Sequence, residues 1–382
     1  MFNLTQELKQ RVAAENDEAY PLFFRLKFAN DWALLSSLLK SDPEIKVQDK
    51  IELQLADLVK LLNPTTKLSI EESGEMVKAH LKGCPLEEYG TWVYYPWKKV
   101  LVHLLDEEEF IRVRTVRNLY KILPEEQAQL RTKKIGIIGL SVGQSVALAL
   151  AMERIGGELR IADMDTIELS NLNRIRTSVS NLAVKKTVVV TREIAELDPY
   201  LKVVCFHEGL HNENIGEFLS GGGNLDLVAE ECDDLKTKIH VRFMCRSLGI
   251  PVIMETSDSF MIDLERFDLD GCRQILHGFT SMENYNAEYI STNKDLLMAN
   301  ILEIPQLSER GQASLAEMGR TISNWPQLGT DVLAGGAITA QLVKEVLLGN
   351  ELPSGRARLE LLAHYKTAFS IQNVTRKNHN PV

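Results

Sequence analysis

Apolar and polar residues alternate along residues 133–256 in a way that predicts short buried strands separated by amphipathic helices. Each apolar run is bounded by glycine, aspartate or proline, and a longer segment with apolar residues at helical spacing follows it. This alternation is typical of a mostly parallel sheet with helices on both faces. The expected strands are residues 133–139, 158–165, 202–210, 224–232 and 250–256, and the expected helices are residues 144–157, 181–199 and 235–249.

The pattern differs before this segment. Residues 51–62 carry leucines and an isoleucine near one helical face, and Pro64 ends that helix. Residues 91–105 are aromatic and β-branched, which favours a strand or a buried docking segment. A charged, helical run follows at residues 106–130. We therefore expect residues 1–109 to form a mainly helical N-terminal region.

The pattern differs after the alternating segment as well. Residues 277–295 are expected to be irregular, and helices are expected at residues 311–322 and 331–350. The predicted fold class is α/β, a Rossmann-like doubly wound sheet with a helical N-terminal extension. The corresponding domains are residues 1–109, 110–355 and a C-terminal tail, 356–382.

Composition narrows the function classes. The 382 residues carry a net charge of −10, which argues against a broad nucleic-acid-binding surface. No apolar run approaches the roughly 20 residues that span a bilayer, and the N-terminus lacks a secretory pattern, so we expect a cytoplasmic protein. No C-x-x-C pair occurs, so no zinc site is expected among the five cysteines, Cys84, Cys205, Cys232, Cys245 and Cys272.

The stretch KKIGIIGLSVGQSVALALA, residues 133–151, fits two kinds of site. In the pattern G-x-S-x-G, formed by Gly139, Ser141 and Gly143, Ser141 would be a hydrolase nucleophile. In a turn between strand and helix, the same residues would lie beside a nucleotide phosphate. A serine elbow usually follows several earlier strands, whereas residues 133–139 form the first expected strand, which favours the nucleotide turn. A turn that binds nothing is the third alternative.

The residues after the second expected strand support a nucleotide site. Asp163 lies 24 residues beyond Gly139, where a carboxylate can accept hydrogen bonds from ribose. A dense polar group follows, and its cations suit the phosphates of a triphosphate better than a nicotinamide dinucleotide. This group consists of Asp165, Asn171, Arg174 and Lys186.

The block DMDTIELSNLNR closely resembles the D-x-D-x-V-x-x-S-N-L-x-R block of the ThiF/MoeB/HesA superfamily, the ubiquitin-activating-enzyme-like adenylating domains. The resemblance extends over about residues 110–350. It implies ATP- and Mg²⁺-dependent adenylation of a carboxylate, with release of pyrophosphate, and it implies a homodimer. The residues at the family's nucleotide-binding positions are Gly139, Ser141, Gly143, Asp163, Asp165 and Asn171, and Ser141 stands where the family has a glycine.

Further positions follow from the same resemblance. Arg174 and Lys186 match residues that contact the phosphates, and Asp233 in DLVAEECDDLKTK matches the magnesium-binding acid. Asp234 and Lys238 stand where the family has asparagine and arginine. Arg117 matches an arginine that reaches into the partner's ATP site. Taken singly, these charged residues also fit a solvated surface or a helix cap.

The acceptor is expected to carry a free carboxylate, as a small carrier protein, a peptide, or a small or tRNA-linked acid. Glu255 and Asp258 follow the fifth expected strand, where relatives form the path for the acceptor. Cys272 is the thiol expected to be most exposed. The segment METSDSFMIDLERFD, together with VYYPW and WPQL, resembles bacterial relatives fused to a nitroreductase-like domain. The chain has little room for such a domain, so no flavin is expected.

Two other function classes stay open at this stage. A dinucleotide-binding oxidoreductase would use Asp163 on an adenosine ribose, but it leaves Arg174 and Lys186 without a function. A non-catalytic scaffold of the same fold is favoured by the departures at Ser141, Asp234 and Lys238.

Overall fold

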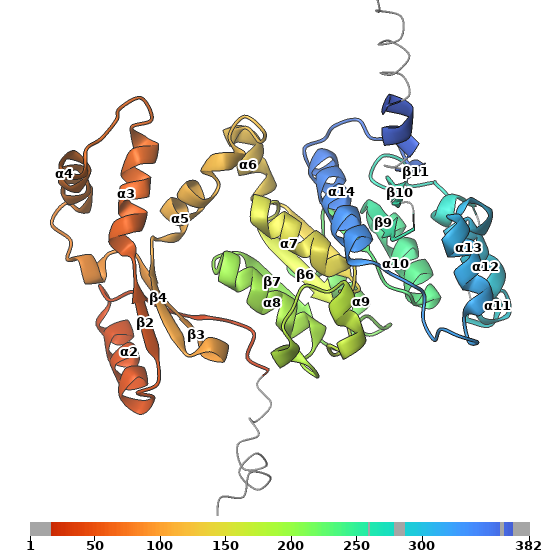
Figure 1. Ribbon diagram of the computed structural model, residues 1–382, viewed down its shortest axis with the longest axis horizontal. Helices are drawn as coiled ribbons and strands as arrows, with labels where there is room; N and C mark the ends of the chain where they lie inside the picture. The colour runs from red at the N-terminus through yellow and green to blue at the C-terminus, as the bar shows by residue number, and fades with distance from the viewer. Residues whose placement is uncertain (1–16, 259, 279–286, 360–362, 370–382) are drawn as a thin grey trace, which may run out of the picture.

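A seven-stranded sheet forms the centre of the larger domain (Figure 1), in the order β11-β10-β9-β8-β5-β6-β7. Strands β5 to β9 are parallel neighbours, whereas β10 and β11 extend the sheet in antiparallel pairings. Numbered from β5, the five parallel strands lie in the order 3-2-1-4-5, which is the doubly wound arrangement. The predicted fold class is confirmed. The order reverses between β5 and β8, so the crevice outside their carboxyl ends is where such sheets bind ligands.

The computed structural model describes residues 17–258, 260–278, 287–359 and 363–369. The strands of the large sheet are β5 (Lys134–Ile138), β6 (Glu158–Ala162), β7 (Lys202–Phe206), β8 (Leu227–Glu230), β9 (Val252–Thr256), β10 (Met261–Glu265) and β11 (Gly355–Arg358). The helices around it are α5 (Glu107–Arg114), α6 (Pro124–Leu130), α7 (Gly143–Glu153), α8 (Lys186–Leu197), α9 (Ile215–Ser220), α10 (Leu235–Leu248), α11 (Ala287–Thr292), α12 (Lys294–Leu302), α13 (Glu309–Glu317) and α14 (Gly329–Leu347). All eight predicted elements of residues 133–256 are present.

Alternate residues of each strand face two different hydrophobic cores, because successive side chains of a strand point to opposite faces. In β8, Leu227 and Ala229 belong to the core under α7 and α14, whereas Val228 belongs to the core under α9 and α10. In β9, Ile253 faces the α7 and α14 core, and Met254 faces the other. The same alternation continues at the ends of β8 and β9, so it determines toward which face of the sheet each acidic side chain there points.

The N-terminal region contains a sheet as well as helices. Its helices are α2 (Ala29–Ser41), α3 (Ile51–Leu62) and α4 (Ile70–Leu81), in agreement with the helical pattern. The sheet has the order β1-β3-β4-β2, a feature that the sequence analysis did not predict. Residues 91–105 contribute a hairpin to it, which agrees with the extended structure expected there. The strands are β1 (Leu22–Phe24), β2 (Lys46–Asp49), β3 (Thr91–Tyr95) and β4 (Val100–Leu104).

Contacts join this small sheet to the end of α8 and the start of β7 (Figure 1). Tyr95 donates to the carbonyl of Ala195 at 3.3 Å, and Trp97 donates to Glu196 at 2.7 Å. The hydroxyl of Tyr200 donates to the carbonyl of Leu105 at 2.7 Å. The N-terminal region therefore lies against the β7 edge of the large sheet, at the opposite edge from β10 and β11.

The segment after residue 275 is more regular than predicted. Helices α11 and α12 occupy part of residues 277–295, where irregular structure was expected, so that prediction is wrong for residues 287–292 and 294–295. Residues 279–286 lie outside the described residues. Strand β11 reaches Arg358, three residues into the segment expected as a tail, because Gly355–Arg358 pairs with β10. An isolated run of GRAR has no apolar alternation that would predict a strand.

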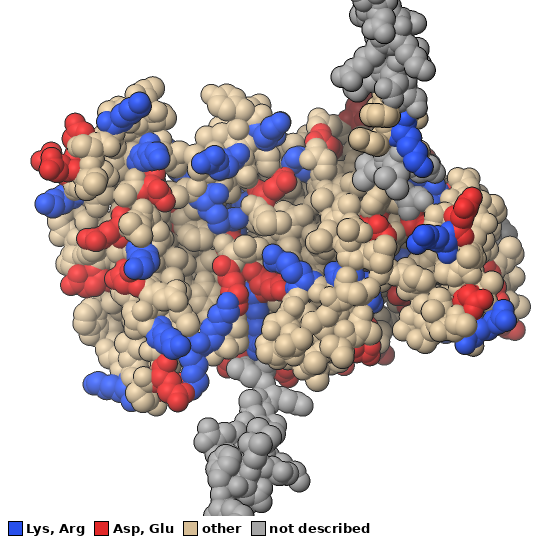
Figure 2. All heavy atoms as spheres, in the orientation of Figure 1, with Lys and Arg blue, Asp and Glu red and all other residues tan. Residues whose placement is uncertain are grey.

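The surface charges are mixed in sign. Figure 2 shows Lys and Arg side chains interspersed with Asp and Glu on the face in view. Within the described residues, no helix is both long and apolar enough to cross a membrane.

Candidate functional site

The turn after β5 requires glycine at position 139. Gly139 has φ +83°, and a Cβ there would lie 2.8 Å from the backbone nitrogen of Cys232 and from the carbonyl of Glu231. The turn therefore lies directly against the chain that leaves β8. Helix α7 begins at Gly143, only four residues later, so its N-terminal N–H groups face the crevice between β5 and β8. A strand, a tight turn and a helix N-terminus are the elements of an anion-binding site.

Asp163, at the end of β6, holds this turn in place. Its carboxylate accepts the backbone N–H of Leu140 at 2.7 Å and that of Asp165 at 2.8 Å. Burial raises the pKa of Asp163, and the charge of Lys186, whose Nζ is 3.9 Å away, opposes that shift. The predicted ribose-binding acid therefore also fixes the geometry of the predicted phosphate turn.

The predicted cations lie around the same turn. Lys186, the first residue of α8, is buried and donates to Asp165 at 2.8 Å. Arg174 is partly buried, and its Nε donates to the hydroxyl of Ser141 at 3.0 Å. Burial lowers the pKa of Arg174, and the negative charge of Asp233 opposes this effect. The structure thus brings together the predicted residues Ser141, Arg174 and Lys186 around one turn.

Polar side chains support the loop that carries Arg174. Asn171 is buried, and its Oδ1 accepts the N–H of Glu168 at 3.0 Å. Gln144 bonds both backbone groups of Arg176, and its amide donates to Glu193 at 2.8 Å. These contacts connect the start of α7 to the loop, so the turn and the guanidinium form one rigid unit.

Ser141 lies beside a cation rather than beside a general base, because its hydroxyl accepts from Arg174. Ser141→Ala should therefore change ATP affinity and turnover by about a hundredfold or less, the size of one hydrogen bond to a charged group. A serine nucleophile would lose roughly 10⁶-fold in turnover. Steady-state kinetics of the variant separate these cases, and a loss above a thousandfold would restore the hydrolase interpretation.

Glu193, which accepts a hydrogen bond from Gln144, provides a pH-dependent test of the contacts that hold the Arg174 loop. Burial raises the pKa of Glu193 to about 7, although Arg176 and Gln144 lower it. The pKa of Glu193 is higher in the folded state than in the unfolded state, where it is about 4.3. Ionisation of Glu193 therefore destabilises the fold as the pH rises from about 4.3 through 7. Glu193→Gln should match the parent at pH 4 and exceed its free energy of unfolding by about 1 kcal/mol at pH 8. Urea unfolding at both pH values measures this, and equal stability at pH 8 would contradict it.

The residues at the end of β8 and just after it divide between the two faces of the sheet. Glu230 is fully buried and accepts Lys238 Nζ at 3.0 and 3.1 Å and Arg242 at 2.6 Å. Lys238 stands where the family has an arginine, and it belongs to a buried group of ion pairs with Glu230 and Arg242. Asp234 caps α10 by accepting the N–H of Thr237 at 2.8 Å, which is the structural alternative considered for it. Asp233 is exposed.

Glu231 and Glu255 form a buried acidic pair on the opposite face. The backbone N–H of Glu255 donates to Glu231 Oε2 at 3.2 Å. Burial raises the pKa of both carboxyl groups, and the charge of Glu231 raises that of Glu255 further. The sequence analysis singled out Glu255 but missed Glu231. Its place directly after a buried strand, beside the predicted Asp233, was the available signal.

Other predicted residues lie elsewhere. Arg117 is exposed on the 3₁₀ turn Val116–Asn118 and takes no part in the contacts around Gly139. Asp258 accepts from the N–H and hydroxyl of Ser308 at 2.8 and 2.6 Å, so it fixes the start of α13.

Cys272 is exposed, as expected, whereas Cys245 is buried. Burial raises the pKa of the Cys232 thiol, and Glu230 raises it further, which disfavours a reactive thiolate.

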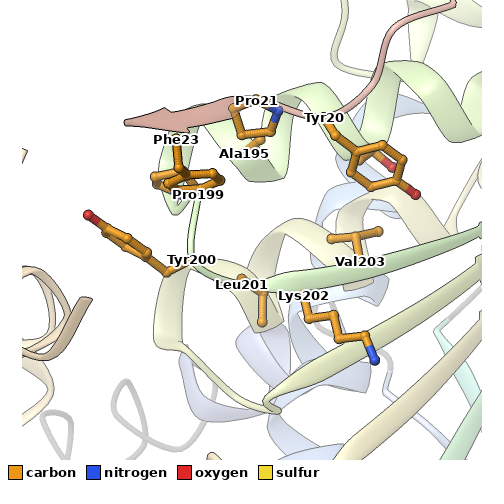
Figure 3. Close-up of a pocket in the computed structure, with 10 residues that line it drawn as sticks. Tyr20, Pro21, Phe23, Ala195, Pro199, Tyr200, Leu201, Lys202 and Val203 are labelled. Atoms are coloured by element: carbon orange, nitrogen blue, oxygen red, sulfur yellow. The ribbon is translucent and has the colours of Figure 1, made fainter. Parts of the chain in front are cut away.

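A small cavity of about 180 Å³ lies between β1 and the β7 edge (Figure 3). It contains none of the residues around the turn. Its walls are largely aromatic and aliphatic, and they are formed by Tyr20, Pro21, Phe23, Thr191, Ala195, Pro199, Tyr200, Leu201, Lys202 and Val203. It is therefore a feature of the contact between the two sheets, separate from the candidate site.

Fold and site together define a doubly wound α/β domain with a phosphate-type turn and clustered cations at its switch point. Residues 114–292 match the model described as ThiF family, so this part of the chain is similar to that family. The resemblance predicted from DMDTIELSNLNR is thereby confirmed.

Relatives of known sequence include an uncharacterised Mycobacterium tuberculosis protein, MT1398, which is 39% identical over 87% of this chain and 44% of its own length. A Haemophilus influenzae tRNA threonylcarbamoyladenosine dehydratase is 34% identical over 34% of this chain and 49% of its own length. The Escherichia coli sulfur carrier protein ThiS adenylyltransferase is 26% identical over 41% and 61%, respectively. The chain thus spans about half the length of these curated relatives.

Similar solved structures include PaaA, with a TM-score of 0.44 and 17% identity over 89% of this chain and 99% of that chain. The E. coli tRNA N6-threonylcarbamoyladenosine dehydratase in complex with ATP has a TM-score of 0.45 and 14% identity over 62% and 95%.

Proposed function

We propose that the protein uses ATP to adenylate a carboxylate and releases pyrophosphate. The observation that carries this proposal is the contact group around Gly139, in which a tight turn, a buried acid and two cations meet at the switch point. The ThiF-family match and the named adenylyltransferase relative support it. The finer assignment, a ubiquitin-like modifier-activating type of enzyme in the cytoplasm, is part of this proposal.

The proposed chemistry needs charge neutralisation more than proton transfer. A carboxylate is already ionised at neutral pH, so its attack on the α-phosphate requires no general base. Bringing two anions together is unfavourable, and Arg174 and Lys186 would offset that repulsion at the phosphates. Asp163 would accept the ribose hydroxyls while it keeps the turn in place. Ser141 and Asn171 would act as polar neighbours of the phosphates and as supports of the loop.

Mg²⁺ is the cofactor proposed with ATP, and when bound it would stabilise the charge that develops on pyrophosphate. Asp233 suits this function in part, because it is exposed and its negative charge acts on Arg174. Within the described residues, no group of three or more His, Cys, Asp or Glu side chains is arranged to hold a metal. An ion near Asp233 would thus depend on phosphate and water oxygens as well, which is how proteins commonly bind Mg²⁺.

The acceptor is proposed to be a small carrier protein or a peptide with a free carboxyl terminus. The names of relatives include an enzyme for the sulfur carrier protein ThiS and a tRNA dehydratase. The net charge of −10 disfavours binding to tRNA, which is also an anion.

We also propose a homodimer in which Arg117 acts on the partner's ATP. Exposed apolar side chains follow Arg117 in the sequence, at Leu119, Tyr120 and Leu123, and exposed apolar groups of this kind are common at subunit interfaces. Arg117→Ala should lower ATP turnover at least tenfold while the free energy of unfolding stays within 0.5 kcal/mol, since the side chain is exposed. Kinetics and denaturant unfolding measure both, and an unchanged turnover would contradict the shared site. Arg112→Ala, an exposed arginine on α5, is the matched control.

ATP–pyrophosphate exchange tests the adenylation directly. Labelled pyrophosphate should enter ATP only when a competent carboxylate acceptor is present, and carrier proteins and peptides ending in a free carboxylate are the first acceptors to examine. ATP binding without exchange for any acceptor would favour a non-catalytic scaffold. Binding of NAD(H) without ATP affinity would favour the oxidoreductase alternative.

A further inference from the structure

Glu231 and Glu255 lie side by side at the switch point of the sheet. The parallel register pairs Ala229 of β8 with Ile253 of β9, and two residues further along it sets Glu231 opposite Glu255. Both side chains point to the face covered by α7 and α14, because 229 and 253 face that core. They are 8% and 4% exposed, respectively.

The oxygens of this pair lack the partners that buried carboxylates normally have. Within the described residues, Glu231 Oε1 and both carboxylate oxygens of Glu255 make no hydrogen bond. Glu230, one residue earlier and on the opposite face, is instead neutralised by Lys238 and Arg242. Burying an unpaired charge is costly, so proteins pair such groups or use them to bind a cation. Glu230 thus has cationic partners, whereas Glu231, the next residue, and Glu255 do not. This difference indicates a ligand on the face covered by α7 and α14.

Gly335 makes the space that Glu255 occupies, and Gly143 lies beside Glu231. A Cβ at Gly335 of α14 would lie 2.4 Å from the carboxyl carbon of Glu255. A Cβ at Gly143, the first residue of α7, would lie 3.8 Å from Glu231 Cγ. The pair is therefore enclosed between two helices, and its Glu231 side runs beneath the turn that begins at Gly139.

In their ionised form, these carboxyl groups would conflict with nucleotide binding unless a cation is present. Asp331 of α14 is a third carboxyl group, and its charge raises the pKa of Glu255. A triphosphate at the adjacent turn would meet these carboxylates at short range, in a site of low dielectric where repulsion is strong. A bound cation between them would turn the repulsion into attraction.

We propose that Glu231 and Glu255 supply the protein ligands of a divalent cation, Mg²⁺ or Mn²⁺, bound between the ends of β8 and β9. Carboxylate oxygens are the ligands that these hard cations prefer, and Mg²⁺ is commonly held by one or two carboxylates with phosphates and water completing the shell. This site is distinct from one at Asp233. Only its connection to nucleotide phosphates rests on the proposed function.

The experiment uses Mn²⁺ alone, without nucleotide, and measures the free ion by electron paramagnetic resonance. The parent protein should bind about one Mn²⁺, and Glu255→Gln should weaken binding at least tenfold, because one of two charged ligands becomes a neutral amide. Glu196→Gln, which changes an exposed carboxyl group on α8, is the matched control and should bind as the parent does. Circular dichroism shows whether the isosteric variant is folded.

Glu231→Gln is the second variant, and it should weaken Mn²⁺ binding to a similar extent. Three outcomes overturn the proposal: absence of Mn²⁺ binding to the folded parent, unchanged affinity in both glutamine variants, or loss of binding in Asp233→Asn alone. A separate ATP titration of the parent keeps the two proposals apart. Mn²⁺ binding at the pair without any ATP affinity would support this site and contradict the proposed function.

Discussion

Gly139→Ala is expected to abolish nucleotide binding and to lower the free energy of unfolding by about 3 kcal/mol or more. Two costs add at this position. The residue has φ +83°, a conformation that L side chains rarely adopt, and its Cβ would lie 2.8 Å from backbone atoms of Glu231 and Cys232. Backbone atoms cannot rotate away as a side chain can, so the turn must separate from the end of β8.

Gly349→Ala is the matched control for this substitution. Gly349 also has φ +83°, but a Cβ there would meet no atom within 4 Å. It should show only the conformational cost, about 1–2 kcal/mol, and ATP affinity should be unchanged. Urea unfolding and calorimetric ATP titration of both variants separate strain from steric clash. Equal stability losses, with ATP binding preserved in Gly139→Ala, would show that the turn does not hold the nucleotide.

Arg174→Ala is expected to weaken ATP binding about 10- to 100-fold and to lower ATP–pyrophosphate exchange by about 10²–10³-fold. The guanidinium is partly buried, and it is oriented by Ser141, by the carbonyl of Ser170 and by Asn173. A cation held in this way stabilises phosphate charge without reorganising during the reaction. Its effect on catalysis should therefore exceed its effect on binding.

Arg176→Ala is the control for Arg174→Ala. The Arg176 side chain is exposed, and its hydrogen bonds with Gln144 use backbone atoms that alanine retains. It should keep ATP affinity within about threefold, as exposed charges at a distance contribute little. If both variants lose affinity equally, the effect would be one of general surface charge, and the specific assignment of Arg174 would be wrong.

The parallel core of the fold could be predicted because its strands are buried on both faces and its helices are amphipathic. Strand β5 and helix α7 show this most clearly, since the apolar run ends at a glycine and a helical pattern follows. Strand β11, with the sequence GRAR, could not be predicted, because only its pairing with β10 makes it a strand. The small N-terminal sheet depends in the same way on pairings between distant segments.

The residues of the candidate site likewise include some that the sequence predicts and some that depend on contacts between distant segments. Asp163, Asp165, Arg174 and Lys186 could be proposed because a contiguous block of sequence carries most of them. Glu231 had only its place near Asp233 as a signal, and nothing local shows that it faces Glu255 from a neighbouring strand. The opposite environments of Glu230 and Glu231 follow from strand alternation, which becomes informative only once the covering helices are known.

Calorimetric titration of the intact chain with ATP and Mg²⁺, with NADH as the competitor, tests the central claim most directly. The account predicts that one ATP binds per chain, that Arg174→Ala and Gly139→Ala weaken or abolish this binding, and that NADH does not displace ATP. Binding of NADH by a chain with no measurable ATP affinity would contradict it.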